Sequence, residues 1–224
     1  MKIKEKKIAS LEVIEVEGNK ESNTIILLHG YGANKEDLFP LHEYIKTPPN
    51  TRWIFPDAPL ELQGYFGRAW FPILASNIDQ IQAGLDFSKI NPKGLKEASE
   101  KILELINSLD TPKEKIILGG FSQGAMLSTE AMLSLNDSIN SLLILSGTLV
   151  NSDNWEQSLS KKSKFHFFQS HGIYDPILPY SNAEKLFNLL KNTNHQGELV
   201  SFNGGHEIPD LVIKKLNLFL ETRL

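Results

Sequence analysis

The chain has 224 residues, a formal net charge of −4 and a sequence pI of about 5.9. Hydrophobic residues make up 41% and charged residues 22%, as in an ordinary globular protein, and the acidic balance argues against a nucleic-acid partner. The absence of cysteine excludes disulfides, thiolate metal sites and a cysteine nucleophile, and it fits a reducing, cytoplasmic location.

The sequence carries no pattern of a targeting or membrane-spanning segment. Residues 1–7 are basic, but the stretch that follows is interrupted by glutamates, so we expect no secretory signal. The longest apolar runs, such as residues 25–28 and 142–145, fall far short of the roughly 20 residues that span a bilayer. We therefore expect no stable membrane insertion.

Short apolar runs alternate with amphipathic stretches, which predicts βαβ units and a mainly parallel sheet with helices on both faces. The first run alternates with a period near two and predicts a half-exposed strand. The predicted strands span residues 10–16, 24–28, 52–55, 115–118, 139–145, 165–169 and 198–202. The predicted helices span residues 34–46, 93–109, 122–135, 183–191 and 209–220. No repeat or linker interrupts this order, so we expect one α/β domain over residues 1–224.

One segment breaks the alternation. Residues 57–91 separate a predicted strand from the strongest helical pattern and form an unusually long connection that is rich in aromatic and aliphatic side chains. Long loops of this kind often form lids or binding loops, although the same side chains could also pack on the core. Both interpretations are open at this point.

A candidate nucleophile lies in the sequence Gly-Phe-Ser-Gln-Gly, residues 120–124, which matches the G-x-S-x-G nucleophile elbow. The motif places its serine, here Ser122, on a sharp turn between a strand and a helix. Glycine two residues before and after the serine avoids collision with neighbouring backbone, and the free N–H groups of the helix face the developing oxyanion. A predicted strand precedes Ser122 and a predicted helix follows it, as the motif requires. The alternative is a glycine-rich turn with an ordinary serine helix cap.

The general base is predicted to be His206. A serine nucleophile needs such a base, and this fold orders the triad as serine, acid, histidine. His206 follows the last predicted strand in a glycine-rich loop, at the strand end where sites of open α/β sheets lie. His29 and His42 precede the serine and are out of order. His166 lies in an apolar strand, and His195 lies in a polar turn that we expect to be solvated. His171 also follows a strand, but it comes before any plausible acid in the right order.

The acid is predicted to be Asp175, which follows the predicted strand 165–169 and precedes His206. Its role is to hold the imidazole tautomer and to stabilise the imidazolium. Three other carboxylates lie in the interval but belong to a turn, a polar loop and a helix: Asp137, Asp153 and Glu184. The alternative for Asp175 is a turn formed by Asp-Pro.

An ester hydrolase also needs two backbone N–H groups that face the oxyanion. One is predicted at Gln123, directly after the nucleophile. The other is predicted at Tyr31, in the His-Gly-Tyr-Gly loop that follows the strand 24–28. The alternative for this loop is a plain glycine turn.

The chain resembles the phospholipase/carboxylesterase family of α/β hydrolases, which includes acyl-protein thioesterases and bacterial carboxylesterases. The resemblance covers nearly the whole chain, in blocks at residues 28–32, 56–59, 67–71, 119–124, 171–175 and 205–209. It implies an α/β-hydrolase fold, a Ser122–His206–Asp175 triad, oxyanion donors at Tyr31 and Gln123, and no metal or organic cofactor. Family members often form homodimers, so a homodimer is a further expectation of the resemblance.

The resemblance implies a small-molecule ester or thioester substrate. It makes the 57–91 segment the acyl-chain wall, with Trp70, Phe71, Ile73 and Leu74 as substrate-binding residues. Phe71 is followed by proline where many eukaryotic thioesterases carry aspartate, which favours a general carboxylesterase acting on short to medium acyl chains. The alternative is a lysophospholipase or acyl-protein thioesterase that prefers long acyl chains.

Overall fold

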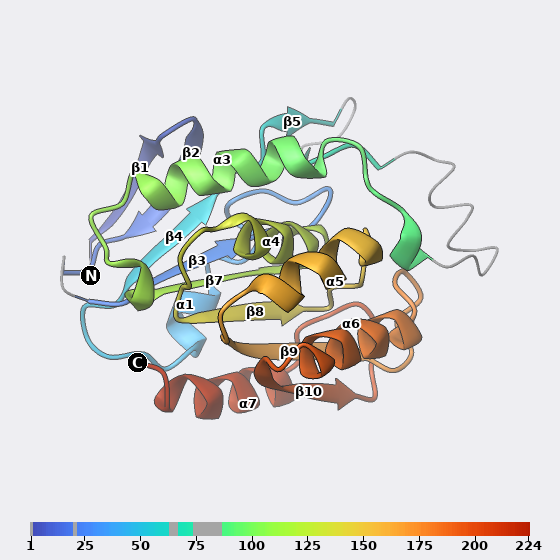
Figure 1. The fold of residues 1–224 in the computed structure, drawn as a ribbon. Coiled ribbons are helices and arrows are strands. Elements are labelled where there is room, and N and C mark those ends of the chain that lie inside the picture. Colours follow the sequence, from blue (N-terminus) through green and yellow to red (C-terminus); the bar gives the residue numbers. More distant parts are fainter. Residues whose placement is uncertain (1, 20–21, 63–66, 74–86) are drawn as a thin grey trace.

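The computed structural model describes residues 2–19, 22–62, 67–73 and 87–224 (Figure 1). An eight-stranded sheet runs through this part of the chain in the order β1-β2-β4-β3-β7-β8-β9-β10, and β5 and β6 pair separately. In this eight-stranded sheet, β1, β2 and β4 pair antiparallel in that order, whereas β4, β3, β7, β8, β9 and β10 pair parallel. The strands are β1 Ile3–Ile8, β2 Leu11–Val16, β3 Thr24–Leu28, β4 Arg52–Pro56, β5 Leu60–Glu61, β6 Arg68–Ala69, β7 Ile116–Phe121, β8 Ser141–Leu145, β9 His166–Gly172 and β10 Gln196–Phe202.

Helices cover both faces of the sheet, as the alternation of elements predicts (Figure 1). One face packs on α3 Leu95–Asn107, α4 Gln123–Ser134, α5 Ser152–Lys161 and α6 Tyr180–Asn192, and the other on α1 Leu41–Tyr44 and α7 Asp210–Glu221. Two short 3-10 helices are η1 Phe87–Lys89 and η2 Lys113–Lys115. None of the helices in the described ranges is long and apolar enough to cross a membrane.

The carboxyl ends of the parallel strands meet at one edge of the sheet, and this edge holds the candidate site. The strand register aligns Leu28 with Gly120 and Phe121 with Leu145. On the other side of β8, Gly172 at the end of β9 aligns with Phe202 at the end of β10. The loops that follow these strands therefore begin at the same level and lie next to one another.

Two expectations about local structure were wrong, and some elements were missed. The predicted helix 34–46 is helical only at Leu41–Tyr44, because Pro40 precedes that turn and Asn34 forms its own turn, with its side chain accepting the Glu36 N–H at 2.9 Å. Strand β1 and helix α5 were not predicted at all. The predicted early strand is not half-exposed: of the residues of β2, only Glu12 is exposed.

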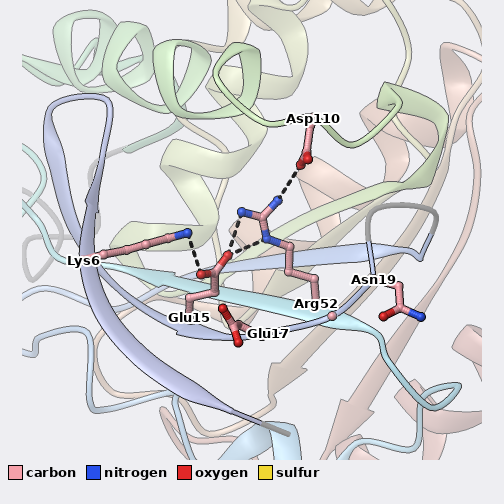
Figure 2. A pocket seen from close by; sticks show the side chains of 7 residues that line it. Lys6, Glu15, Glu17, Asn19, Arg52 and Asp110 are labelled. Carbon is pink, nitrogen blue, oxygen red and sulfur yellow. Dashed lines mark hydrogen bonds and ion pairs between the residues drawn. The ribbon is translucent and has the colours of Figure 1, made fainter.

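Glu15 of β2 is buried because two cations neutralise it (Figure 2). Nζ of Lys6 lies 2.6 Å from Oε2 of Glu15, and Nη2 of Arg52 lies 2.6 Å from Oε1. Arg52 also contacts Asp110 at 3.3 Å, and the group lines a cavity of about 190 Å³. Arg52 is the first residue of β4, so these ion pairs join β1, β2 and β4 at the end of the parallel strands opposite the candidate site.

Candidate active site

Ser122 occupies the turn between β7 and α4. Its backbone is strained, with φ 55° and ψ −117°, a conformation that non-glycine residues rarely adopt. The Ser122 N–H donates to the Leu145 carbonyl at 2.9 Å, which anchors the turn to the neighbouring strand β8. Because α4 begins at Gln123, the unpaired N–H groups of its first turn lie beside the serine.

The two glycines of the motif are required by close backbone contacts. A Cβ at Gly120 would lie 2.4 Å from the carbonyl carbon of Gly124, and a Cβ at Gly124 would lie 2.0 Å from the Leu28 oxygen. Both distances are shorter than any van der Waals contact. Glycine therefore lets α4 start directly against β3 and β7, which is what makes the turn sharp.

Asp175 lies in the loop that follows β9, and its side chain is fully buried. Oδ1 accepts the backbone N–H groups of Ile177 at 2.8 Å and Leu178 at 2.9 Å. Oδ2 lies 2.7 Å from Nδ1 of His206 and 3.2 Å from Nε2 of His171. Burial alone would raise the pKa of Asp175, but these hydrogen bonds outweigh it and hold the pKa well below its usual range. Asp175 is therefore a buried carboxylate in its charged form.

His206 lies in the loop that follows β10, and backbone hydrogen bonds hold this loop beside the loop of Asp175. The N–H groups of Ile173 and Tyr174 donate to the carbonyls of Phe202 at 2.9 Å and Gly204 at 3.0 Å. The contact of Nδ1 with Asp175 assigns the ring proton to Nδ1 and leaves Nε2 as an acceptor. The imidazole packs on the ring of Phe121, with centroids 4.8 Å apart, directly before Ser122 in the chain.

The loop after β3 approaches the serine from the other side. A Cβ at Gly30 would lie 3.5 Å from Cβ of Ser122, so this loop lies next to the nucleophile. Nδ1 of His29 donates to the Gly30 carbonyl at 2.8 Å. Because C=O and N–H point in opposite directions in a trans peptide, this bond turns the Tyr31 N–H away from His29. Among the described residues, the backbone N–H groups of Tyr31 and Gln123 have no acceptor in the fold, as an oxyanion hole requires.

The family model described as phospholipase/carboxylesterase matches residues 9–224. The chain belongs to this family. Membership confirms the predicted family and the prediction of a serine hydrolase that acts on ester bonds.

The chain is similar to several proteins named acyl-protein thioesterase 1. The protein from Kluyveromyces lactis is 34% identical over 74% of this chain and 76% of its own length. The acyl-protein thioesterase 1 homolog 1 of Dictyostelium discoideum is 31% identical over 98% of both chains. Among solved structures, esterase PE8 has a TM-score of 0.79 at 22% identity with full coverage of both chains. The Bacillus cereus carboxylesterase has a TM-score of 0.75 at 18% identity over 96% of each chain. These structures confirm the predicted α/β-hydrolase fold.

Sequence reasoning missed the side chains that support the oxyanion loop. Nε2 of His29 accepts the Ala58 N–H at 3.1 Å, and the indole N–H of Trp70 donates to the His29 carbonyl at 2.9 Å. Arg68 lies 3.7 Å from Asp57 and donates to the Ala58 carbonyl, and its backbone carbonyl accepts the Gly32 N–H at 2.9 Å. The sequence feature that could have revealed these residues is the family resemblance, because they all lie in its blocks 28–32, 56–59 and 67–71.

The side chain of Gln123 has a role that was also missed. Its Oε1 accepts the Trp70 N–H at 2.9 Å, and its Nε2 donates to the Phe71 carbonyl at 2.7 Å. Both hydrogen bonds are buried. The side chain of Gln123 therefore fixes the backbone of residues 70–71 against α4, and the backbone N–H of the same residue lies next to the serine.

The predicted substrate-binding residues fall into three groups. Trp70 and Phe71 are each 2% exposed and belong to the core that contains α3 and α4. Ile73 is partly exposed, and Leu74 lies outside the described residues, as do residues 75–86. The structure thus brings Trp70 and Phe71 next to Gln123, and the acyl-wall role of this segment stays a prediction.

Besides His29, two more histidines that were set aside on sequence grounds are buried. His195, expected to be solvated, is 2% exposed and stacks on Phe165 with ring centroids 3.9 Å apart, so that expectation was wrong. Its position in a polar turn hid its packing, because the polar neighbours face water while the ring faces the core. His171 is fully buried beside Asp175.

Proposed function

We propose that this protein hydrolyses carboxylic esters with short to medium acyl chains through an acyl-enzyme on Ser122. The observation that carries the proposal is the 2.7 Å contact between His206 and Asp175, at the same sheet edge as a strained Ser122. Family membership supports the reaction class. The buried carboxylate and the imidazole that it orients supply the base that a serine nucleophile needs.

In the first half of the reaction, Oγ of Ser122 attacks the carbonyl carbon of the ester while Nε2 of His206 takes the hydroxyl proton. The carbonyl oxygen becomes an oxyanion that accepts hydrogen bonds from the backbone N–H groups of Tyr31 and Gln123. Asp175 stabilises the imidazolium through Nδ1 and remains ionised. The bond to the leaving group then breaks, and His206 donates its proton to the departing alkoxide or thiolate.

In the second half, His206 takes a proton from water, and the resulting hydroxide attacks the acyl carbon of the acyl-enzyme. The oxyanion again accepts hydrogen bonds from the backbone N–H groups of Tyr31 and Gln123. Collapse of this intermediate breaks the bond to Oγ, His206 returns the proton to Ser122, and the carboxylic acid leaves. No cofactor is needed for either half, because every proton that moves passes through His206.

A second candidate function is favoured by the names of the relatives. The proteins of Kluyveromyces lactis and Candida albicans are named acyl-protein thioesterase 1, with identities of 34% and 29% to this chain. A thioesterase or lysophospholipase with a long-acyl preference would use the same triad and differ in its acyl-chain wall. A cytoplasmic location, a single domain and a homodimer stay predictions alongside both candidates.

The experiment that tests the proposal is hydrolysis of p-nitrophenyl esters from acetate to palmitate by the wild-type protein and by Ser122→Ala. We expect the highest kcat/KM at short to medium chains and a loss of at least about 1,000-fold in the variant. A maximum at palmitate, combined with loss in Ser122→Ala, would favour the long-acyl candidate. Undiminished turnover by Ser122→Ala would contradict both candidates.

A further inference from the structure

Asp175 contacts a second imidazole besides that of His206. Nε2 of His171, at the carboxyl end of β9, lies 3.2 Å from Oδ2 of Asp175, the same oxygen that accepts from His206. The side chains of His171 and Asp175 are both 0% exposed. No step of the acyl transfer described above uses His171, although it is a titratable side chain buried in direct contact with the triad.

The partners of His171 identify its tautomer. Nε2 lies 2.8 Å from the carbonyl oxygen of Leu178, which can only accept a hydrogen bond, so Nε2 carries the proton. Within the described part of the chain, Nδ1 is buried without a hydrogen-bond partner. A proton on Nδ1 would therefore be a buried donor with no acceptor. The arrangement is that of an imidazole whose single N–H donates to Leu178 and lies 3.2 Å from Oδ2 of Asp175.

These contacts close the loop that carries the acid. Through Leu178, His171 ties the far end of the loop 172–178 to the end of β9, and through Oδ2 it contacts the acid from within the fold. The side chains of Ile173, Tyr174 and Ile177 are exposed, so within this loop packing fixes mainly its far end, where Leu178 is buried in the core. Oδ1 is held by backbone N–H groups, whereas Oδ2 is held by the two imidazoles alone among the described residues.

We propose that His171 is a positioning residue for the triad. Its N–H holds Oδ2 of Asp175 against Nδ1 of His206 and takes up part of the negative charge of the carboxylate. The inference rests on the proposed Ser122–His206–Asp175 mechanism and adds a fourth member to it. His171 acts only through Asp175 and does not touch the reacting atoms.

Two consequences follow for catalysis. Without the His171 N–H, the charge of Asp175 falls more fully on His206, so the imidazolium form of His206 is favoured and the acid limb of kcat/KM moves to higher pH. Without this contact the carboxylate is also less well fixed, and a displacement of about 1 Å near the reacting groups can cost about 100-fold in rate.

The titratable side chains around this carboxylate define what else can influence the pH profile. His171 faces Asp175 from β9, and His206 faces it from the loop before α7. The ring of Tyr180, at the start of α6, lies 6.2 Å from the ring of His171. The carboxylate of Glu207 accepts the Gly205 N–H at 3.2 Å, so it is directed to its own loop.

The test compares two variants of similar size. His171→Gln keeps an N–H donor at the position of Nε2, and His171→Met fills a similar volume without a donor. We expect His171→Met to lower kcat/KM by about 10- to 100-fold and to move its acid limb upward by about half a pH unit or more. We expect His171→Gln to regain most of the rate and the wild-type pH profile.

His195→Met is the matched control. His195 is also a buried histidine with an unpartnered Nδ1 among the described residues, but its Nε2 faces the Leu159 carbonyl and not the triad. We expect this variant to keep the wild-type kcat/KM and acid limb. Thermal unfolding identifies any variant that fails to fold. If His171→Met fails, His171→Asn replaces it, because its shorter amide does not reach Oδ2.

Wild-type rates and an unchanged acid limb in His171→Met would overturn the role of His171. Equal losses in the Gln and Met variants, with an unchanged acid limb, would overturn it as well, because they would assign His171 to packing alone. Ser122→Ala in the same assay separates this failure from that of the proposed function. An active Ser122→Ala would overturn the triad itself, whereas an inactive one leaves the triad standing whatever His171 does.

Discussion

Nδ1 of His206 lies 2.7 Å from Oδ2 of Asp175, although 31 positions separate the two residues along the chain. The contact exists because β9 and β10 are neighbours in parallel register and their carboxyl-end loops continue to hydrogen bond beyond the strands. A buried, charged carboxylate thereby meets one imidazole nitrogen, and the other nitrogen is the base that we propose for Ser122.

We expect Asp175→Asn to lower kcat by about 1,000- to 10,000-fold. An amide at this position cannot stabilise an imidazolium, and its NH₂ group would face the N–H of His206 or force the other tautomer. Steady-state kinetics on a p-nitrophenyl ester measure the loss, with circular dichroism as the control for folding. A decrease of less than tenfold would contradict the assignment of Asp175 as the triad acid.

The depressed pKa of Asp175 also predicts how stability depends on pH. A group whose pKa is lower in the folded state stabilises the fold above its unfolded pKa, about 3.9 for aspartate, and loses this contribution as the pH falls through the folded pKa. We expect wild-type protein to exceed Asp175→Asn in free energy of unfolding by about 2 kcal/mol at neutral pH. Urea denaturation should show this difference shrinking below about pH 4, and a difference that grew on acidification would have the wrong sign.

His29 is expected to act on the oxyanion hole without touching the substrate. His29→Leu removes the N–H that holds the Gly30 carbonyl, so the Tyr31 N–H loses its fixed direction, and we expect kcat to fall by about 10- to 100-fold. His29→Asn is the matched variant, because its amide can still donate to Gly30, and it should retain more activity. The prediction fails if the two variants lose the same activity or if only KM changes.

Gln123→Met is expected to separate the side chain of Gln123 from its backbone. The variant keeps the backbone N–H that we propose as an oxyanion donor but removes the hydrogen bonds to the backbone of Trp70 and Phe71. It leaves a buried N–H and a buried carbonyl unpaired, so we expect a loss of about 2 to 4 kcal/mol in the free energy of unfolding. If residues 70–73 form the acyl wall, the preferred chain length should change as well, whereas an unchanged profile of p-nitrophenyl esters would contradict that role.

Much of the site could be predicted from the sequence because its chemistry constrains local pattern. The elbow at Ser122 needs glycines at fixed spacing, and the order of serine, acid and histidine directed the choice to Asp175 and His206. The structure brings the last two together. In contrast, the roles of His29 and His171 depend on contacts across the fold, which neither spacing nor order along the chain expresses.

The fold was predictable where burial imposes a period and less so elsewhere. The buried strands and α3 were found because their apolar residues repeat at strand or helix spacing. Strand β1 was missed because its burial alternates weakly, with Ile8 its only buried residue. Helix α5 was missed because it buries only Trp155 and Leu159 of its ten residues. In β2 the sequence predicted too much exposure. Glu15 is charged but buried, because it forms ion pairs with Lys6 and Arg52.

The most direct test of the central claim is covalent labelling of the nucleophile. The wild-type protein is treated with a fluorophosphonate, and the modified residue is located by mass spectrometry of its peptides. The account predicts one adduct, on Ser122, that forms together with the loss of ester hydrolysis, is absent from Ser122→Ala and forms far more slowly in His206→Ala. An unlabelled Ser122 in a protein that hydrolyses esters, or an adduct on another serine that accompanies inactivation, would contradict it.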